Sequence, residues 1–303
     1  MLPNVRFRLP YTLAHYNFKN KLTNLNDLFW FSECQKITAK KFLHAHGKDD
    51  IITQILGVSN ENSRRYPRRI EEYDSISKNH EKWIKSNLIV CLSACFEVYL
   101  KSILTLSFKF DPGILIGAQG HIDGFKLMCE ENSTINKLIE ISIEKATRGD
   151  WSSRVSEMRR ILPTVADQFL PPIISELEFI RKYRNSISHA FDVDLEYMSY
   201  SASINSIPLR SVSIDRIKLI LKNVIDLAKN IDSIVYRYEL VIFEYLLYLQ
   251  HEFSGKYISD AALLPTRQIE LRKKVGFKLG HPILGKAATE EMLIFYKDFC
   301  YKQ

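Results

Sequence analysis

One six-residue segment of the chain carries the side chains best suited to proton transfer beside a phosphate group. It reads Arg184-Asn185-Ser186-Ile187-Ser188-His189 and lies near the end of the predicted helix Ile173–Ala190. Histidine has an unperturbed pKa of about 6.5, so it can accept and donate a proton near neutral pH. Arginine presents a planar fork of donors that matches phosphate oxygens, and the amide of Asn185 can orient either side chain. The segment therefore predicts acid–base chemistry at a phosphate.

The helix that carries this segment should have a polar face and an apolar face. A helical wheel at about 100° per residue predicts one polar stripe, made by Glu178, Arg181, Asn185 and His189. Arg184 falls on the edge of the apolar stripe that contains Leu177 and Ile180. A charge in that position is costly unless it is paired, so we expect a carboxylate within its reach.

Two glutamates are candidates for pairing with Arg184. Glu178 lies on the same helix, and Glu97 lies in an otherwise apolar helix, where its charge needs a cation. Glu97 could instead pair with Lys101 one helical turn further on. Both pairings of Glu97 remain open on the sequence alone.

The spacing of the arginine, asparagine and histidine resembles the signature of the HEPN superfamily (higher eukaryotes and prokaryotes nucleotide-binding domains). A second likeness is Ala94–Lys101, which is similar to the first core helix of several prokaryotic HEPN families. The resemblance covers the chain from Tyr73 to Gln250. It implies an all-α, HEPN-like helical bundle. Many members of this superfamily are metal-independent ribonucleases, including toxins and abortive-infection proteins.

The resemblance implies cleavage of RNA by transesterification, in which the ribose 2′-OH attacks the neighbouring phosphorus. His189 would act as the general base or acid, a role worth about 10²–10⁴-fold in rate. Arg184 would stabilise the charge that develops on the phosphoryl oxygens, while Asn185 would orient the ring or bind phosphate. Glu178 and Glu97 complete the predicted catalytic set. No metal or other cofactor is implied.

The same resemblance implies partners and leaves an alternative open. Arg184 and His189 are about 140° apart on the wheel, and family members pair so that two motif helices meet, which predicts a homodimer. RNA and an antitoxin or other partner protein are the further expected partners, in phage defence or a toxin–antitoxin pair. The alternative is a HEPN module without catalysis that dimerises or binds RNA. An Arg-Asn-x3-His run can also simply end a helix, where a cationic histidine complements the dipole.

Composition indicates a globular cytoplasmic protein. The 303 residues carry a net charge of +7, and 46% of them are hydrophobic and 25% charged. A basic balance favours an anionic partner such as RNA, though weakly. The five cysteines are odd in number and make no disulfide or zinc framework, so Cys91 and Cys95 are expected to pack in the core. The longest apolar stretches are interrupted by charges such as Glu97 and Lys101, so no membrane span is predicted.

Hydrophobic periodicity predicts a chain made of helices. The expected helices are Asn24–Phe42, Glu72–Phe108, Ser133–Thr147, Trp151–Leu162, Ile173–Ala190, one from Ser213 to Gln250, and Thr289–Tyr301. The stretch Leu195–Val212 is expected to be an irregular loop or a short hairpin. The predicted organisation is an N-terminal extension (1–70), a HEPN-like helical domain (71–250) and a C-terminal extension packing on the body (251–303).

Three further groups of residues have a functional and an ordinary interpretation. Arg272-Lys273-Lys274 is the best basic patch for phosphate and joins Arg181 as a predicted RNA contact, against a default of solvated surface. Tyr236-Arg237-Tyr238 resembles an aromatic–basic element for stacking RNA, but it lies in the predicted helix from Ser213 to Gln250. His44 and His46, followed by two aspartates, could hold a metal, but a polar loop is favoured.

Overall fold

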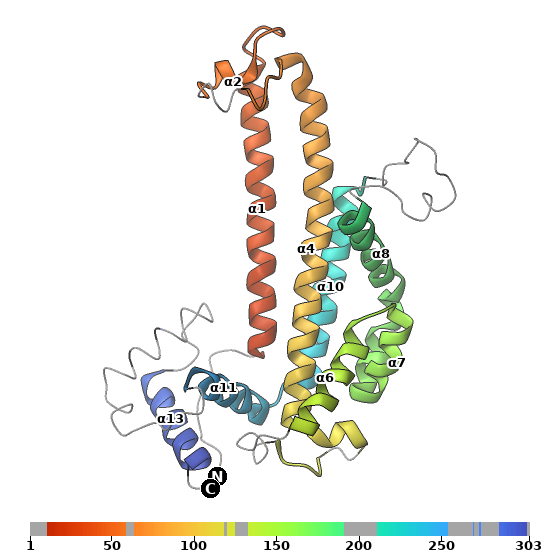
Figure 1. Ribbon diagram of the computed structural model, residues 1–303, viewed down its shortest axis with the longest axis vertical. Coiled ribbons are helices and arrows are strands. Elements are labelled where there is room, and N and C mark those ends of the chain that lie inside the picture. The colour runs from red at the N-terminus through yellow and green to blue at the C-terminus, as the bar shows by residue number, and fades with distance from the viewer. Residues whose placement is uncertain are drawn as a thin grey trace. The chain divides into compact units, whose positions relative to one another are not determined.

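The computed structural model describes residues 11–58, 64–117, 120–124, 133–190, 211–253, 269, 273 and 285–301. Over these ranges the chain is helical and contains no β-strand, only an isolated antiparallel bridge between Ile51 and Arg69. The predicted all-α class is therefore confirmed. Figure 1 labels the α-helices, which are α1 (Leu13–Leu43), α2 (Ile52–Ile55), α4 (Tyr73–Phe110), α6 (Ser133–Thr147), α7 (Trp151–Ile161), α8 (Ile174–Ala190), α10 (Ile214–Val235), α11 (Tyr238–Phe253) and α13 (Lys286–Tyr301).

Local sequence signals set most helix ends where they were predicted. The Asp-Pro-Gly stop after α4 is confirmed: Asp111 accepts a hydrogen bond from the N–H of Gly113 at 3.2 Å, and the short 3₁₀ helix η2 (Pro112–Ile116) follows. Ser213 caps α10 by accepting from the N–H of Arg216 at 3.2 Å. The two prolines before the motif helix form the 3₁₀ turn η4 (Pro171–Ile173), from which α8 continues.

The predicted single helix from Ser213 to Gln250 is wrong, because the chain breaks into α10 and α11 at Tyr236 and Arg237. In the last backbone hydrogen bond before the break, the N–H of Tyr236 donates to the carbonyl of Asp232. The first one after the break is donated by the N–H of Val241 to the carbonyl of Arg237. The break contains no glycine or proline. The two helices on either side differ in burial: α10 buries one stripe, whereas α11 is apolar on most of its sides.

The chain divides into two compact units, each made of separate stretches. The first unit comprises Met1–Lys19, Phe96–Leu177 and Asn223–Gln303. Its core brings together the C-terminal part of α4 with the paired helices α6 and α7 and the paired helices α11 and α13. Its largest fully buried side chains include Tyr99, Phe108, Phe243, Tyr245 and Tyr296.

The N-terminus of α1 is fixed within the first unit by two carboxylates from distant helices. Asp232 on α10 accepts hydrogen bonds from the hydroxyl and the N–H of Thr12. Glu244 on α11 accepts from the N–H of Leu13 at 2.9 Å and of Ala14 at 3.2 Å. These acceptors satisfy N–H groups that a helix leaves without internal partners. They explain why α1 begins at Leu13, well before the predicted start at Asn24.

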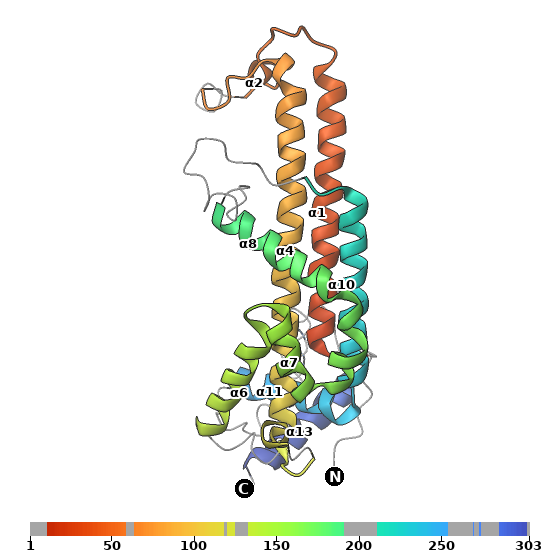
Figure 2. The same cartoon turned by 90° about the vertical axis from the view of Figure 1, so that its right-hand side faces the viewer.

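The second unit comprises Asn20–Cys95 and Glu178–Lys222. In it, α1 and α4 lie side by side and antiparallel (Figures 1 and 2). Glu81 of α4 joins them, because its carboxylate binds Lys36 of α1 at 3.1 Å as well as Lys85 of its own helix. The ammonium groups of Lys85 and Lys36 lower the pKa of Glu81. Leu43 at the end of α1 forms a small core with Ile52 and Ile70.

One helical stretch of the described residues, Ile70–Phe110, is long and apolar enough to cross a membrane by length and composition alone. In its most apolar window, 44% of the residues are buried inside the protein. A core helix of a soluble protein passes the same test, so the expected lack of a membrane span stays a prediction.

Parts of the predicted organisation fall outside the described residues. The loop or hairpin predicted over Leu195–Val212 lies almost entirely within residues 191–210, which are outside the described ranges. Most of the predicted C-terminal extension lies outside them too, although its terminal helix is confirmed as α13. The division into 1–70, 71–250 and 251–303 stays a prediction.

The carboxyl of Glu244 should make stability depend on pH. Burial raises its pKa to about 7, while the N–H groups of Leu13 and Ala14 oppose the shift and the charge of Asp232 adds to it. A raised folded-state pKa means that the fold prefers the protonated acid. Its contribution is therefore complete below the unfolded-state pKa of about 4.3 and is lost as the pH rises through the folded-state value.

Between pH 5 and pH 8, the wild type should lose about 2 kcal/mol more unfolding free energy than Glu244→Gln, which keeps an acceptor but does not titrate. Urea denaturation at both pH values measures this difference. Glu239→Gln, an exposed position in the first turn of the same helix, is the matched control and should follow the wild type. Equal pH dependence in the wild type and Glu244→Gln would contradict the burial of this carboxyl.

Candidate functional site

The predicted motif lies on one continuous helix. α8 runs from Ile174 to Ala190, so Arg184, Asn185 and His189 share its last turns, as the sequence predicted. The backbone at His189 is helical, while its side chain lies outside the described residues. Arg184 and Asn185 are both half-buried. A half-buried position keeps a side chain ordered by its neighbours and still reachable from solvent.

The buried face of α8 holds the motif helix in place within the second unit. Ile180 is buried as predicted, and so is Tyr183, which directly precedes the motif and which the sequence analysis missed. The Tyr183 hydroxyl and the Ser86 hydroxyl of α4 are 2.9 Å apart and share a hydrogen bond. The signal for Tyr183 was its spacing of three residues from Ile180, which places it on the same face.

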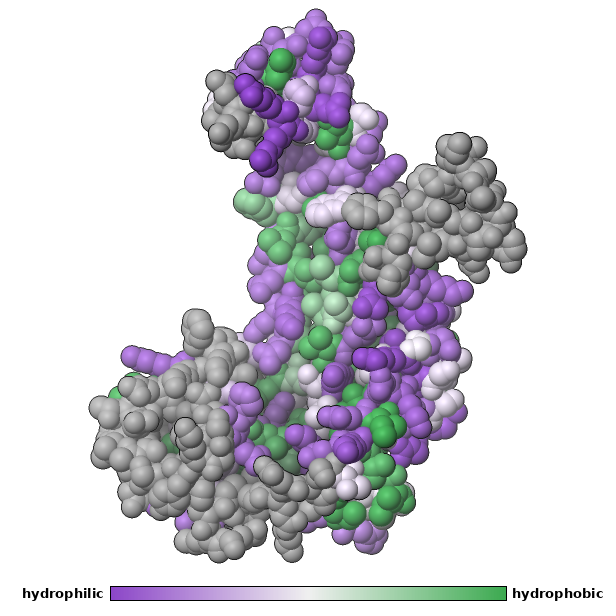
Figure 3. All heavy atoms as spheres, viewed as in Figure 1, coloured by the Kyte–Doolittle hydropathy of each residue, from purple (hydrophilic) through white to green (hydrophobic). Residues whose placement is uncertain are grey.

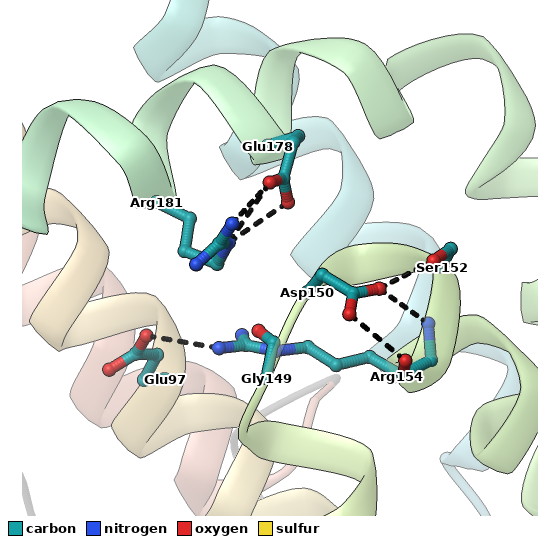
Figure 4. Close-up of polar contacts among 8 residues, drawn as sticks. Glu97, Gly149, Asp150, Ser152, Arg154, Glu178 and Arg181 are labelled. Atoms are coloured by element: carbon teal, nitrogen blue, oxygen red, sulfur yellow. Dashed lines mark hydrogen bonds and ion pairs between the residues drawn. The ribbon is translucent and has the colours of Figure 1, made fainter. Parts of the chain in front are cut away.

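Glu178 and Arg181 form an ion pair on the polar face of α8. The Nε of Arg181 donates to both carboxylate oxygens of Glu178, at 3.1 and 3.0 Å, and Nη2 donates to one of them as well (Figure 4). Both side chains are about one quarter exposed, at 24% and 28%. The pair places a fixed guanidinium one turn before Asn185. The predicted pairing of Arg184 with Glu178 or Glu97 stays a prediction.

Glu97 has a partner that the sequence analysis did not find. In the first unit, Nη2 of Arg154 on α7 lies 3.6 Å from the Glu97 carboxylate on α4 (Figure 4). The Arg154 side chain is only 5% exposed, its Nε donates to the carbonyl of Gly149 at 3.0 Å, and its guanidinium lies over the ring of Trp151. The sequence offered Lys101 as the local alternative, but Lys101 is exposed. No local spacing could connect Glu97 with Arg154, because they come from different helices.

The remaining predicted contacts are scattered or lie outside the described residues. Arg272 and Lys274 are outside the described ranges, and Lys273 is exposed. His44 and His46 are exposed residues at the end of α1. Within the described part of the chain, no group of three or more metal-ligating side chains comes together.

No family model, characterised protein or solved structure matches this chain. The assignment to the HEPN superfamily therefore stays a prediction, based on the motif and on the helices that surround it in the sequence.

Removing the charge of Glu97 should destabilise the protein through Arg154. A buried guanidinium that loses its carboxylate loses compensation for its charge, and breaking a fully buried pair costs about 3–5 kcal/mol. Glu97 is 25% exposed, so we expect Glu97→Gln to lower the unfolding free energy by about 1–3 kcal/mol. Thermal and urea denaturation measure this loss.

Glu144→Gln is the matched control. It breaks a pair with Arg148 whose side chains are 56% and 78% exposed, and an exposed pair contributes at most about 1 kcal/mol. Equal losses in the two variants would show that Arg154 does not depend on Glu97.

Proposed function

We propose that this protein is a metal-independent endoribonuclease of the HEPN type, acting in phage defence or in a toxin–antitoxin pair. The observation that carries the proposal is that Arg184, Asn185 and His189 lie on one helix, close to its end. The surrounding side chains support it, because Arg184 and Asn185 are half-buried beside the ordered pair of Glu178 and Arg181.

In the proposed reaction, a base removes the proton of a ribose 2′-OH, and the oxygen attacks the adjacent phosphorus. An acid gives a proton to the departing 5′-oxygen. His189 performs one of these transfers, and Arg184 stabilises the negative charge on the phosphoryl oxygens. Asn185 orients the ring or the phosphate. The products are a 2′,3′-cyclic phosphate and a 5′-hydroxyl end.

Arg181 and Glu97 have positioning roles in this proposal. Glu178 neutralises Arg181 while holding its guanidinium in place, so that Arg181 contributes directed N–H groups toward RNA rather than a mobile charge. Glu97 is held by Arg154, which fixes its carboxylate on α4. Lys273, together with Arg272 and Lys274, supplies further positive charge for the RNA backbone.

The second candidate is a HEPN module that dimerises or binds a partner protein without catalysis. An observation in the second unit favours it: Trp30, Phe31 and Trp83 are 50%, 61% and 58% exposed. Figure 3 shows other residues of high hydropathy over parts of α1 and α4. Large exposed apolar groups that gather on one surface are typical of an interaction site. A homodimer or an antitoxin would cover them, in a protein that we place in the cytoplasm.

Purified protein should cut single-stranded RNA in EDTA and leave cyclic phosphate ends. Arg184→Ala and His189→Ala should each reduce the rate by at least about 10²-fold, the lower end for a general acid or base. Gel electrophoresis of end-labelled RNA measures the cleavage rates and identifies the product ends. Arg159→Ala removes an exposed arginine of the first unit that pairs with Asp167, and it should cut normally.

Each result has a clear meaning. Mutants of Arg184 and His189 that cut as fast as the wild type would show that the site is elsewhere. Loss of cutting in EDTA would show that the reaction needs a metal. Folded protein that binds RNA but never cuts it would favour the second candidate.

Subunit mixing tests whether two chains share a site. A two-fold homodimer that brings two copies of α8 together would draw Arg184 from one chain and His189 from the other. Mixed dimers of the Arg184→Ala and His189→Ala variants should then regain part of the activity that each variant alone lacks. A protein that is monomeric at micromolar concentration and still cleaves RNA contradicts a composite site, and sedimentation velocity identifies that case.

A further inference from the structure

Three irregular junctions of the first unit border one cavity of about 430 Å³, which is open to solvent on one side. Its walls come from the end of α4 with η2, from the end of α7, and from the junction between α10 and α11. Cavities that hold small molecules measure about 300–1,000 Å³ and combine apolar walls with a few polar groups. The size and the lining of this cavity both fit that description.

The first irregularity is the break between α10 and α11. The hydrophobic pattern predicts one helix there, and the break contains no glycine or proline. Ile234, Arg237 and Leu240 from both sides of the break line the cavity. A departure from local sequence preference is typical of a functional position. Arg237 thus forms part of a cavity wall, where the sequence predicts a helical surface.

The second irregularity follows α7. Pro163 and Thr164 line the cavity, and the next residues, Val165–Phe169, form a π-helix. Such π-helical turns are rare and are found frequently at functional sites. Because proline interrupts the α-helical bonding, the chain turns at this wall and exposes Thr164.

The third wall is a loop held tightly against the end of α4. Asp111 accepts hydrogen bonds from the N–H groups of Gly113 at 3.2 Å and of Gly120 at 2.8 Å. At Gly124, a Cβ atom would lie 2.2 Å from the carbonyl oxygen of Lys109, so only glycine permits this close approach. Gly113, Gly120 and Gly124 are therefore held close to the end of α4, and both oxygens of Asp111 accept hydrogen bonds there.

We propose that this cavity binds a small amphipathic anion, with its apolar body among Phe110, Ile114 and Leu240 and its anionic group on Arg237. Arginine donates a fork of N–H groups that matches carboxylate and phosphate alike. The first turn of α11 starts at the same place, and its N–H groups, which have no partner within the helix, add positive potential. Asp111 also lines the cavity, but its oxygens already accept from the loop. The proposal does not depend on ribonuclease activity.

Binding can be measured with two fluorescent probes on the full-length protein. Anilinonaphthalene sulfonate carries an aromatic body and one anionic group, and N-phenyl-1-naphthylamine has the same body without the charge. The wild type should bind one sulfonate probe saturably. Arg237→Gln should lower the affinity for the sulfonate probe by about tenfold or more, as expected for the loss of one charge-assisted hydrogen bond. The affinity for the neutral probe should not change.

Two further variants separate this cavity from other apolar surfaces. Thr164→Trp fills the cavity from an exposed position, so the fold should persist while both probes lose affinity. Arg65→Gln removes an exposed arginine of the second unit and should change neither probe. Circular dichroism and thermal melting of each variant check that it is folded.

Competition identifies the anionic group. Octanoate and 1-naphthyl phosphate should both displace the sulfonate probe. The competitor that displaces it at the lower concentration shows whether a carboxylate or a phosphate is preferred. The neutral 1-octanol should displace it only weakly. Three outcomes overturn the proposal: no saturable binding by the wild type, equal effects of Arg237→Gln and Arg65→Gln, or unchanged sulfonate binding in Thr164→Trp.

Discussion

The first turn of α1 has N–H groups that no isolated helix can satisfy, and this structure satisfies them with carboxylates from distant helices. Thr12 binds Asp232, and Leu13 and Ala14 bind Glu244, across separations of 220 to 231 residues. The fixed start of α1 brings Phe18 against Phe96, and Phe96 packs against Trp151. Arg154 in turn lies over Trp151 and reaches Glu97. Through this series of contacts, the position of Glu97 depends on the hydrogen bonds that Asp232 and Glu244 accept at the start of α1.

The motif helix α8 combines two demands that oppose each other. It buries Ile180 and Tyr183, which hold it in place, and it leaves Arg184 and Asn185 half-buried, where the proposed function needs them to be accessible to a phosphate. The structure meets both by giving each demand its own face, with the hydrogen bond between Tyr183 and Ser86 on one and the Glu178–Arg181 pair on the other. Preorganised donors of this kind need little rearrangement when charge develops in a reaction.

Regular and irregular segments contribute differently to this protein. The regular helices bury continuous apolar stripes, and they account for the core around Tyr99, Phe108 and Met158. The irregular segments, which are the α10–α11 break and the turn at Pro163 and Thr164 just before the π-helix Val165–Phe169, border a cavity instead. Segments that leave the regular geometry lose helical hydrogen bonds, and a binding function would explain why such segments meet at one place.

The sequence alone determined the all-α class and most helix ends, because hydrophobic periodicity and capping residues such as Asp111 and Ser213 act within a few residues. It also placed Arg184, Asn185 and His189 on one helix. Only the tertiary structure decided that α1 begins at Leu13, that Glu97 pairs with Arg154, and that α10 ends before Tyr236. The first two depend on groups from helices that are distant in the sequence. The spacing of residues along the sequence does not reveal such contacts, because they form only when the helices of the whole unit pack together.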